Sequence, residues 1–176
     1  MSVHLVSWPR AGSHMVRDVI KDATGFQLIM SHDTSLQERH EQVIYLRRDA
    51  LDVVYSQHVA RHGTGSEWMV NWIKNMLRML FRHQCWYGPS CRLNVFYEEL
   101  VKGMKTGDPR EWEKMTRLLG LEARKEDWVR AFHANTRAAV IKRYSNDKWF
   151  GEHMLGIGYD VRRKEFREKF SRYWEG

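Results

Sequence analysis

The stretch Val3-His4-Leu5-Val6-Ser7-Trp8-Pro9-Arg10-Ala11-Gly12-Ser13 decides the fold of this chain. Residues 3–7 form a short β-prone run that ends at Trp8-Pro9, and residues 13–20 follow with apolar side chains at helical spacing. In parallel sheets, the loop after a strand lies at the carboxyl edge, where the next helix offers unpaired N–H groups to an anion. The opening therefore predicts a strand, an anion-binding loop and a helix.

Strands and helices continue to alternate after this opening. Val43-Ile44-Tyr45-Leu46 is almost wholly apolar, as expected for a strand that is buried on both faces of a parallel sheet. We also expect strands at residues 26–30 and 91–97. Asp49 is placed to cap a helix that ends at residues 63–65. The alternation predicts an α/β fold with three layers and a mainly parallel central sheet.

Further helices complete the expected fold. Ser66 is expected to cap a helix that runs to about His83, and Asp108-Pro109 to open another. Residues 125–176 read as helical with interruptions, so the C-terminal third is expected to be helical. No linker or composition shift divides the chain, and we expect one domain over residues 1–176.

The composition narrows the class of protein. The chain has 176 residues, 43% of them hydrophobic and 12% aromatic, which indicates a folded domain. Its formal net charge of +7 suits a nucleotide, a nucleic acid or an anionic membrane surface. Cys85 and Cys91 form neither a disulfide framework nor a zinc motif. No targeting segment or membrane span is recognisable, so a cytoplasmic protein without membrane association is expected.

The residues of the first loop suit a phosphate. Gly12 allows the backbone to approach an anion closely, Ser13 can donate a hydroxyl, and Arg10 supplies a permanent cation. The G-x-x-x-x-G-K-[ST] pattern of a Walker A loop is absent, because no Lys precedes Ser13. The loop is thus P-loop-like, but an ordinary nucleoside triphosphate kinase is disfavoured.

A second motif follows the strand at residues 43–46. Arg48 stands at the end of that strand, and Ser56 lies two helical turns beyond the expected cap at Asp49. These two side chains can converge on one anion.

In these two motifs the chain resembles the sulfotransferases that use 3′-phosphoadenosine 5′-phosphosulfate (PAPS). Their first loop reads Pro-Lys/Arg-Ser-Gly-Thr and their second motif Arg-(Asn/Asp)-Pro-x-Asp-x-x-x-Ser, similar to residues 9–13 and 48–56 here. Residues 96–100 and 118–121 also resemble the family's Tyr-Glu-Asp-Leu and Leu-Gly-Leu segments. The similarity covers about residues 3–121.

The resemblance implies a set of nucleotide contacts. The first loop would hold the 5′-phosphosulfate, Arg48 and Ser56 would hold the 3′-phosphate, and Tyr97 would lie near the adenine. PAPS would be the sulfonate donor and 3′-phosphoadenosine 5′-phosphate (PAP) the product, with no metal. In the last third, Arg143 and Trp149 have the residue types of the segment that covers the nucleotide. Together the implied nucleotide-binding residues are Pro9, Arg10, Ala11, Gly12, Ser13, His14, Arg48, Ser56, Tyr97, Arg143 and Trp149.

The resemblance also implies catalytic roles. Arg10 stands where the family usually has Lys and would neutralise charge on the departing nucleotide. His32 aligns with the general base of the family's Lys-Thr-His segment. His14, which replaces a Thr, is the alternative base. The acceptor would be a hydroxyl or amine of a small molecule, glycan or peptide, and no nucleic-acid partner is expected.

Three alternatives stay open at this point. A small-molecule kinase with a P-loop-like site would need a Walker Lys and acidic magnesium ligands, which the sequence does not display. A noncatalytic nucleotide or nucleic-acid module fits the charge and the aromatic content. A sulfotransferase-like protein without activity fits the departures at Arg10 and His14.

Overall fold

The computed structural model describes residues 3–32, 43–63, 65–89, 91–136, 139 and 159–174. Its centre is a parallel sheet of four strands in the order β2-β1-β3-β4. The strands are β1 (His4–Ser7), β2 (Ile29–Ser31), β3 (Val43–Arg47) and β4 (Leu93–Phe96). The predicted α/β class with a parallel sheet is confirmed.

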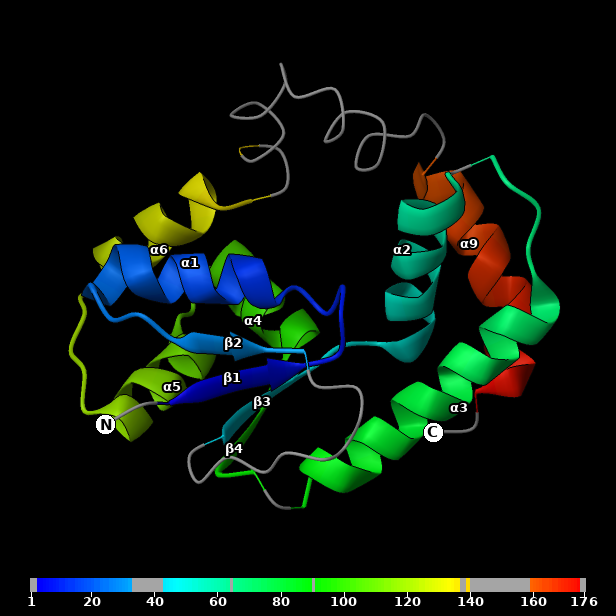
Figure 1. Cartoon of the computed structure of the whole chain (residues 1–176). Helices are drawn as coiled ribbons and strands as arrows, with labels where there is room; N and C mark the ends of the chain where they lie inside the picture. Colours follow the sequence, from blue (N-terminus) through cyan, green and yellow to red (C-terminus); the bar gives the residue numbers. More distant parts are fainter. Residues whose placement is uncertain are drawn as a thin grey trace.

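Helices cover both faces of this sheet (Figure 1). One face packs against α1 (Ser13–Thr24), α4 (Tyr97–Lys105), α5 (Arg110–Leu119) and α6 (Lys125–Ala134). The other side of the molecule holds α2 (Ala50–His62), α3 (Val70–Tyr87), α9 (Tyr159–Phe170) and the short 3₁₀ helix η1 (Ser171–Tyr173). None of the helices in the described ranges is long and apolar enough to span a bilayer.

The two cores explain the nearly continuous apolar pattern of the strands. Leu5 of β1 points into the core shared with α1, α4, α5 and α6. Its neighbour Val6 points to the opposite face, where Tyr45 and Tyr87 pack. Because successive strand residues alternate between faces and both faces are covered, each strand needs apolar side chains at nearly every position.

Some element boundaries differ from the sequence prediction. The predicted cap Ser66 does not begin α3, which starts at Val70 and extends to Tyr87. The Ser66 hydroxyl instead donates to the Gly63 carbonyl and meets Nε2 of His58. The strand expected at residues 91–97 is shorter, because Tyr97 already begins α4. Local polar contacts and helix packing therefore shift these ends by a few residues.

The segment of α9 alternates Arg and Lys with Glu, a pattern typical of a solvated helix face, but two of its arginines bind α2. The guanidinium groups of Arg163 and Arg167 bind Asp52, whose side chain is only 5% exposed, and Arg167 also binds Asp49. On the same helix Phe166 and Phe170 are fully buried against α2 and α3. Figure 1 shows α9 beside α2. The C-terminal helix is thus joined to α2 by both apolar and ionic contacts.

Candidate functional site

The predicted site residues in the described ranges gather at the carboxyl edge of the sheet. The first loop follows β1, His32 follows β2, Arg48 follows β3 and Tyr97 follows β4. Because all four strands are parallel, these ends share one edge, toward the arrowheads in Figure 1. The chain passes from β1 outward to β2 and from β3 outward to β4, so β1 and β3 flank the point where ligands bind in such sheets.

The first loop is a tight turn with an unusual backbone. The N–H of Ala11 donates to the Trp8 carbonyl at 3.1 Å. Arg10 has a φ of 73° and is, among the described residues, the one non-glycine with positive φ. An L-residue in this region costs about 1–2 kcal/mol. Such strain is commonly retained where function requires a particular side-chain position.

The loop ends at the uncapped N-terminus of α1. Gly12 is the N-cap residue, with a φ of 98° and no side-chain hydrogen bond to the first turn. The first turn also lacks an acidic residue, and Ser13 within it is buried. The N–H groups of this turn and the positive end of the helix dipole are therefore available to an anion.

Arg10 connects the first loop to both residues of the second motif. Its Nε donates to Oγ of Ser56 at 3.3 Å. An Nη of Arg48 donates to the carbonyl of Arg10 at 3.1 Å. Nε of Arg48 is buried and has no hydrogen-bond partner among the described residues. Two cations and a hydroxyl thus lie within one network, and one donor in it is unused.

Tyr97 closes this arrangement from the end of β4. The guanidinium carbon of Arg48 lies 4.7 Å from the centroid of the Tyr97 ring, in a cation–π contact. A Cβ at Gly12 would lie only 2.6 Å from Cδ2 of the same ring. Position 12 therefore requires glycine for two reasons, its positive φ and the space that Tyr97 occupies.

His32 is held with one ring nitrogen directed at the first loop. Its Nδ1 lies 3.1 Å from the carbonyl oxygen of Ser7 and 3.3 Å from Oγ of Ser7. In the tautomer with the proton on Nδ1, that N–H donates to the carbonyl. Nε2 then carries the lone pair and lies 3.5 Å from Oγ of Ser13. The ring itself is exposed. In that tautomer Nε2 can accept a proton at the first loop.

His14 lies beside His32, with 6.2 Å between the ring centroids. Partial burial lowers the pKa of His14 below its ordinary value of 6.5, and the nearby charges of Arg17, His32 and Arg10 lower it further, against the opposing effect of Asp18. Its imidazole is therefore neutral near pH 7 and able to accept a hydrogen bond. Both histidine candidates stand at the same edge of the site.

The sequence analysis missed the supporting contacts of three residues. Gln57 accepts a hydrogen bond at 3.1 Å from the indole of Trp8 and so fixes the start of the first loop. Asp49, beyond capping α2, binds Arg167, and Asp52 binds both arginines of α9. The partners in these ion pairs are more than 100 positions apart in the sequence, so no local pattern signals them. The predicted residues Arg143 and Trp149 lie outside the described residues.

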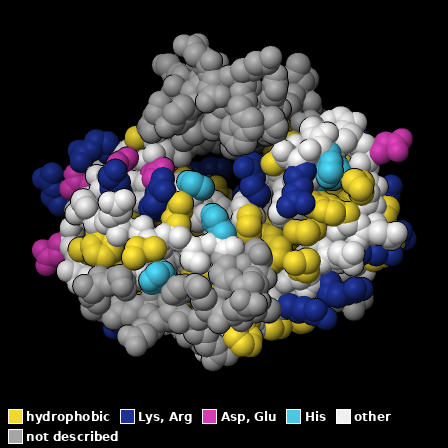
Figure 2. Space-filling view, in the orientation of Figure 1, with side chains coloured by type: hydrophobic (Ala, Val, Ile, Leu, Met, Phe, Trp, Pro, Cys, Tyr) yellow, Lys and Arg dark blue, Asp and Glu magenta, His cyan; other side chains and the backbone are white. Residues whose placement is uncertain are grey.

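The surface around the site is basic. Figure 2 shows Lys and Arg side chains and histidines around a recess between the part of the molecule with α1 and the part with α2. The cations favour an anionic ligand, and the histidines add groups that can exchange protons.

Comparison with known proteins gives a structural match. No family model and no curated protein matches the sequence. Among solved structures, the mouse sulfotransferase SULT7A1, determined in complex with PAP, aligns with a TM-score of 0.58 and 16% sequence identity. The alignment covers 96% of this chain and 88% of the mouse chain. The likeness extends through the fold, although the sequences have diverged widely.

Proposed function

Since the chain has a sulfotransferase-like α/β fold, we propose that it transfers sulfonate from PAPS to a hydroxyl or amine of a small molecule, glycan or peptide. One observation carries the proposal: Arg10, held at positive φ, is hydrogen-bonded to both Ser56 and Arg48. An anion site at the N-terminus of α1 and a second one around Arg48 and Ser56 suit a nucleotide that carries anionic groups at its 5′ and 3′ positions.

The donor groups fit such a nucleotide. The uncapped first turn of α1 and the cation of Arg10 suit the 5′ end. The unused buried Nε of Arg48 suits a phosphate oxygen, because a buried donor without a partner costs about 1–3 kcal/mol that a ligand can recover. PAPS supplies the sulfonate group when bound, and PAP is the nucleotide that remains.

The protein's own groups can then support transfer. Arg10 remains protonated at any physiological pH, so its role is to stabilise negative charge at the first loop. In the tautomer whose Nδ1–H donates to the Ser7 carbonyl, Nε2 of His32 can accept the proton that the acceptor hydroxyl or amine loses. A neutral His14 can accept a hydrogen bond from the acceptor or take its proton if His32 does not. The positive charge of Arg10 and the positive end of the α1 dipole favour the negative charge that develops at the first loop during transfer.

Thermal unfolding with nucleotides tests the proposal directly. At a concentration of 100 times Kd, a ligand adds about 2.7 kcal/mol of stability, which raises Tm by roughly 5–10 °C for a chain of this size. PAP should give this shift, while AMP and ATP, which lack the 3′-phosphate, should give much less at equal concentration. Equal shifts with all three, or no shift with PAP, would contradict the proposal.

A further inference from the structure

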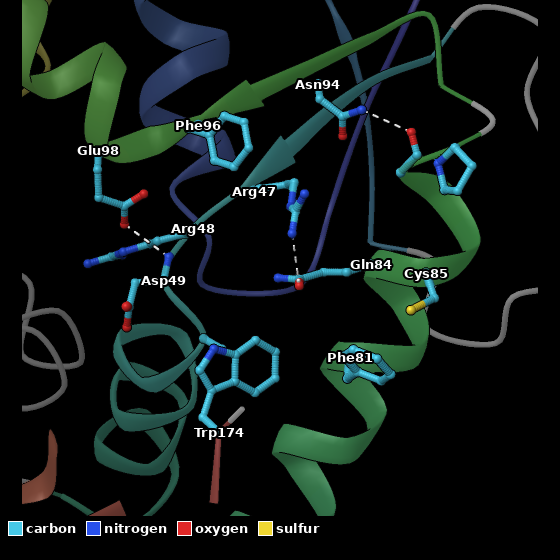
Figure 3. A pocket seen from close by; sticks show the side chains of 13 residues that line it. Arg47, Arg48, Asp49, Phe81, Gln84, Cys85, Asn94, Phe96, Glu98 and Trp174 are labelled. Carbon is cyan, nitrogen blue, oxygen red and sulfur yellow. Dashed lines mark hydrogen bonds between the residues drawn. The ribbon is translucent and has the colours of Figure 1, made fainter. Parts of the chain in front are cut away.

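A cavity lies beside the sheet at the ends of β3 and β4, and no residue of the first loop lines it. Its volume is about 590 Å³, within the usual range of small-molecule sites, and Figure 3 shows its lining. The walls come from the ends of β3 and β4, the C-terminal half of α3 and Trp174. Consecutive residues Arg47 and Arg48 leave β3 in different directions: Arg47 points to Gln84 of α3, and Arg48 points away from it.

Arg47 is the principal cation of this cavity. One of its terminal nitrogens donates to Oε1 of Gln84 at 3.3 Å, and its guanidinium lies 5.1 Å from the centroid of Phe96. Nε of Arg47 is buried without a hydrogen-bond partner, and no carboxylate of the described ranges forms an ion pair with it. A partly buried cation with an unused N–H is a recognition point for an anionic oxygen.

The acidic residues that border the cavity do not neutralise Arg47. Asp49 binds Arg167 of α9. Glu98 accepts the backbone N–H of Asp49 at 3.0 Å and lies at the Arg48 end of the cavity (Figure 3). Neither carboxylate therefore forms an ion pair with Arg47.

Three aromatic side chains form part of the wall. Phe81 and Phe96 are 50% and 45% exposed, unusual values for such large apolar groups. Trp174 meets Phe81 edge to face, with 6.3 Å between the ring centroids. From this combination we infer that the cavity binds a planar aromatic anion, with its rings against Phe81, Phe96 and Trp174 and its anionic group on Arg47.

This ligand site is distinct from the transfer site. The cavity lining does not include Arg10, Ser13, Ser56 or His32. Arg48 is the one residue shared by the cavity and the candidate transfer site among the described residues. The bound anion is therefore not the group that reacts at the first loop. The inference does not depend on nucleotide binding and stands even if PAP fails to bind.

Calorimetric titration with naphthalene-2-sulfonate tests the inference, with the neutral naphthalene-2-sulfonamide as the matched ligand. Arg47→Gln should weaken sulfonate binding at least tenfold and leave the weaker sulfonamide binding unchanged. Arg78→Gln removes an exposed arginine of α3 that does not line the cavity, and it should change neither affinity. Equal effects of the two substitutions, or equal affinity for the two ligands, would overturn the inference.

Cysteine alkylation tests occupancy without a change at Arg47. Cys85 is exposed and lines the cavity, whereas burial raises the pKa of the Cys91 thiol. In a Cys91→Ser variant, saturating naphthalene-2-sulfonate should slow iodoacetamide alkylation of Cys85 several-fold, measured by mass spectrometry. An unchanged rate refutes the site. If PAP displaces naphthalene-2-sulfonate, and if Arg10→Gln also abolishes naphthalene-2-sulfonate binding, then naphthalene-2-sulfonate binds at the first loop. That result would also refute the inference.

Discussion

The ion pairs between α2 and α9 allow one prediction to be worked out in full. Asp52 is 5% exposed and receives both Arg163 and Arg167, each 39% exposed. Removing one partner of a fully buried pair costs roughly 3–5 kcal/mol, because a charge remains buried and unpaired. Water can solvate the partly exposed arginines, so we expect Asp52→Asn to lower the free energy of unfolding by about 2–3 kcal/mol.

Urea unfolding of a double-mutant cycle measures this coupling. The cycle comprises the wild type, Asp52→Asn, Arg163→Gln and the double variant. We expect a coupling free energy of roughly 1–2 kcal/mol for the Asp52–Arg163 pair. Lys164→Gln on the same helix is the matched control, since Lys164 forms no ion pair within the part of the chain that the structure describes. Single effects that add to within about 0.3 kcal/mol would refute the reasoning.

The same carboxylate predicts a pH dependence. Burial alone would raise the pKa of Asp52, but hydrogen bonds and charges from Arg163 and Arg167 outweigh burial and hold the pKa below its ordinary value of 3.8. The unfolded chain therefore binds this proton more tightly, and the stabilisation is complete above the unfolded pKa. It is lost as the pH falls through the lower, folded pKa. In Asp52→Asn, the acid limb of stability against pH should be shallower than in the wild type.

Four further predictions concern the candidate site. His32→Gln should reduce transfer by roughly 10²–10⁴-fold while the thermal shift with PAP stays unchanged; full turnover would remove His32 as the base. Arg48→Gln should abolish the preference for PAP over AMP in the same thermal assay. In urea unfolding, Arg10→Gly should be about 1 kcal/mol more stable than Arg10→Ala, because only alanine keeps the cost of positive φ. Gly12→Ala should displace Tyr97 and cost about 1–3 kcal/mol.

The sequence could predict the parts of the fold that local patterns encode. Residues 43–46 are apolar on both faces because both faces are covered, and β3 occupies Val43–Arg47 as expected. Asp49 caps α2 through a bond from the Asp52 N–H, which is a contact within one turn. Ser66 has the same capping chemistry, yet it bonds to Gly63 and His58. A cap residue therefore marks a polar turn, but its tertiary neighbours decide whether a helix begins there.

That the candidate residues after the strands lie close together was predictable for a similar reason. The ends of parallel strands meet at one edge of a sheet, so the first loop, His32 and Arg48 needed only their places after a strand. The contacts among these residues were not predictable. No pattern in the sequence indicates that Arg10 has positive φ, or that Tyr97 occupies the space above Gly12. The second depends on how β4 and α4 place Tyr97 against the first loop, which is a property of the assembled fold.

The role of α9 extends the site beyond the two motifs. Asp49 immediately follows Arg48, caps α2 and binds Arg167, so the C-terminal helix fixes the backbone from which Arg48 projects. Ser56 lies on the same α2, and its hydroxyl accepts the hydrogen bond from Arg10. A shift of α2 away from α9 would therefore move both residues of the second motif together. Substitutions in the α2–α9 ion pairs should consequently weaken PAP binding more than AMP binding, although none of these ion pairs includes Arg48 or Ser56.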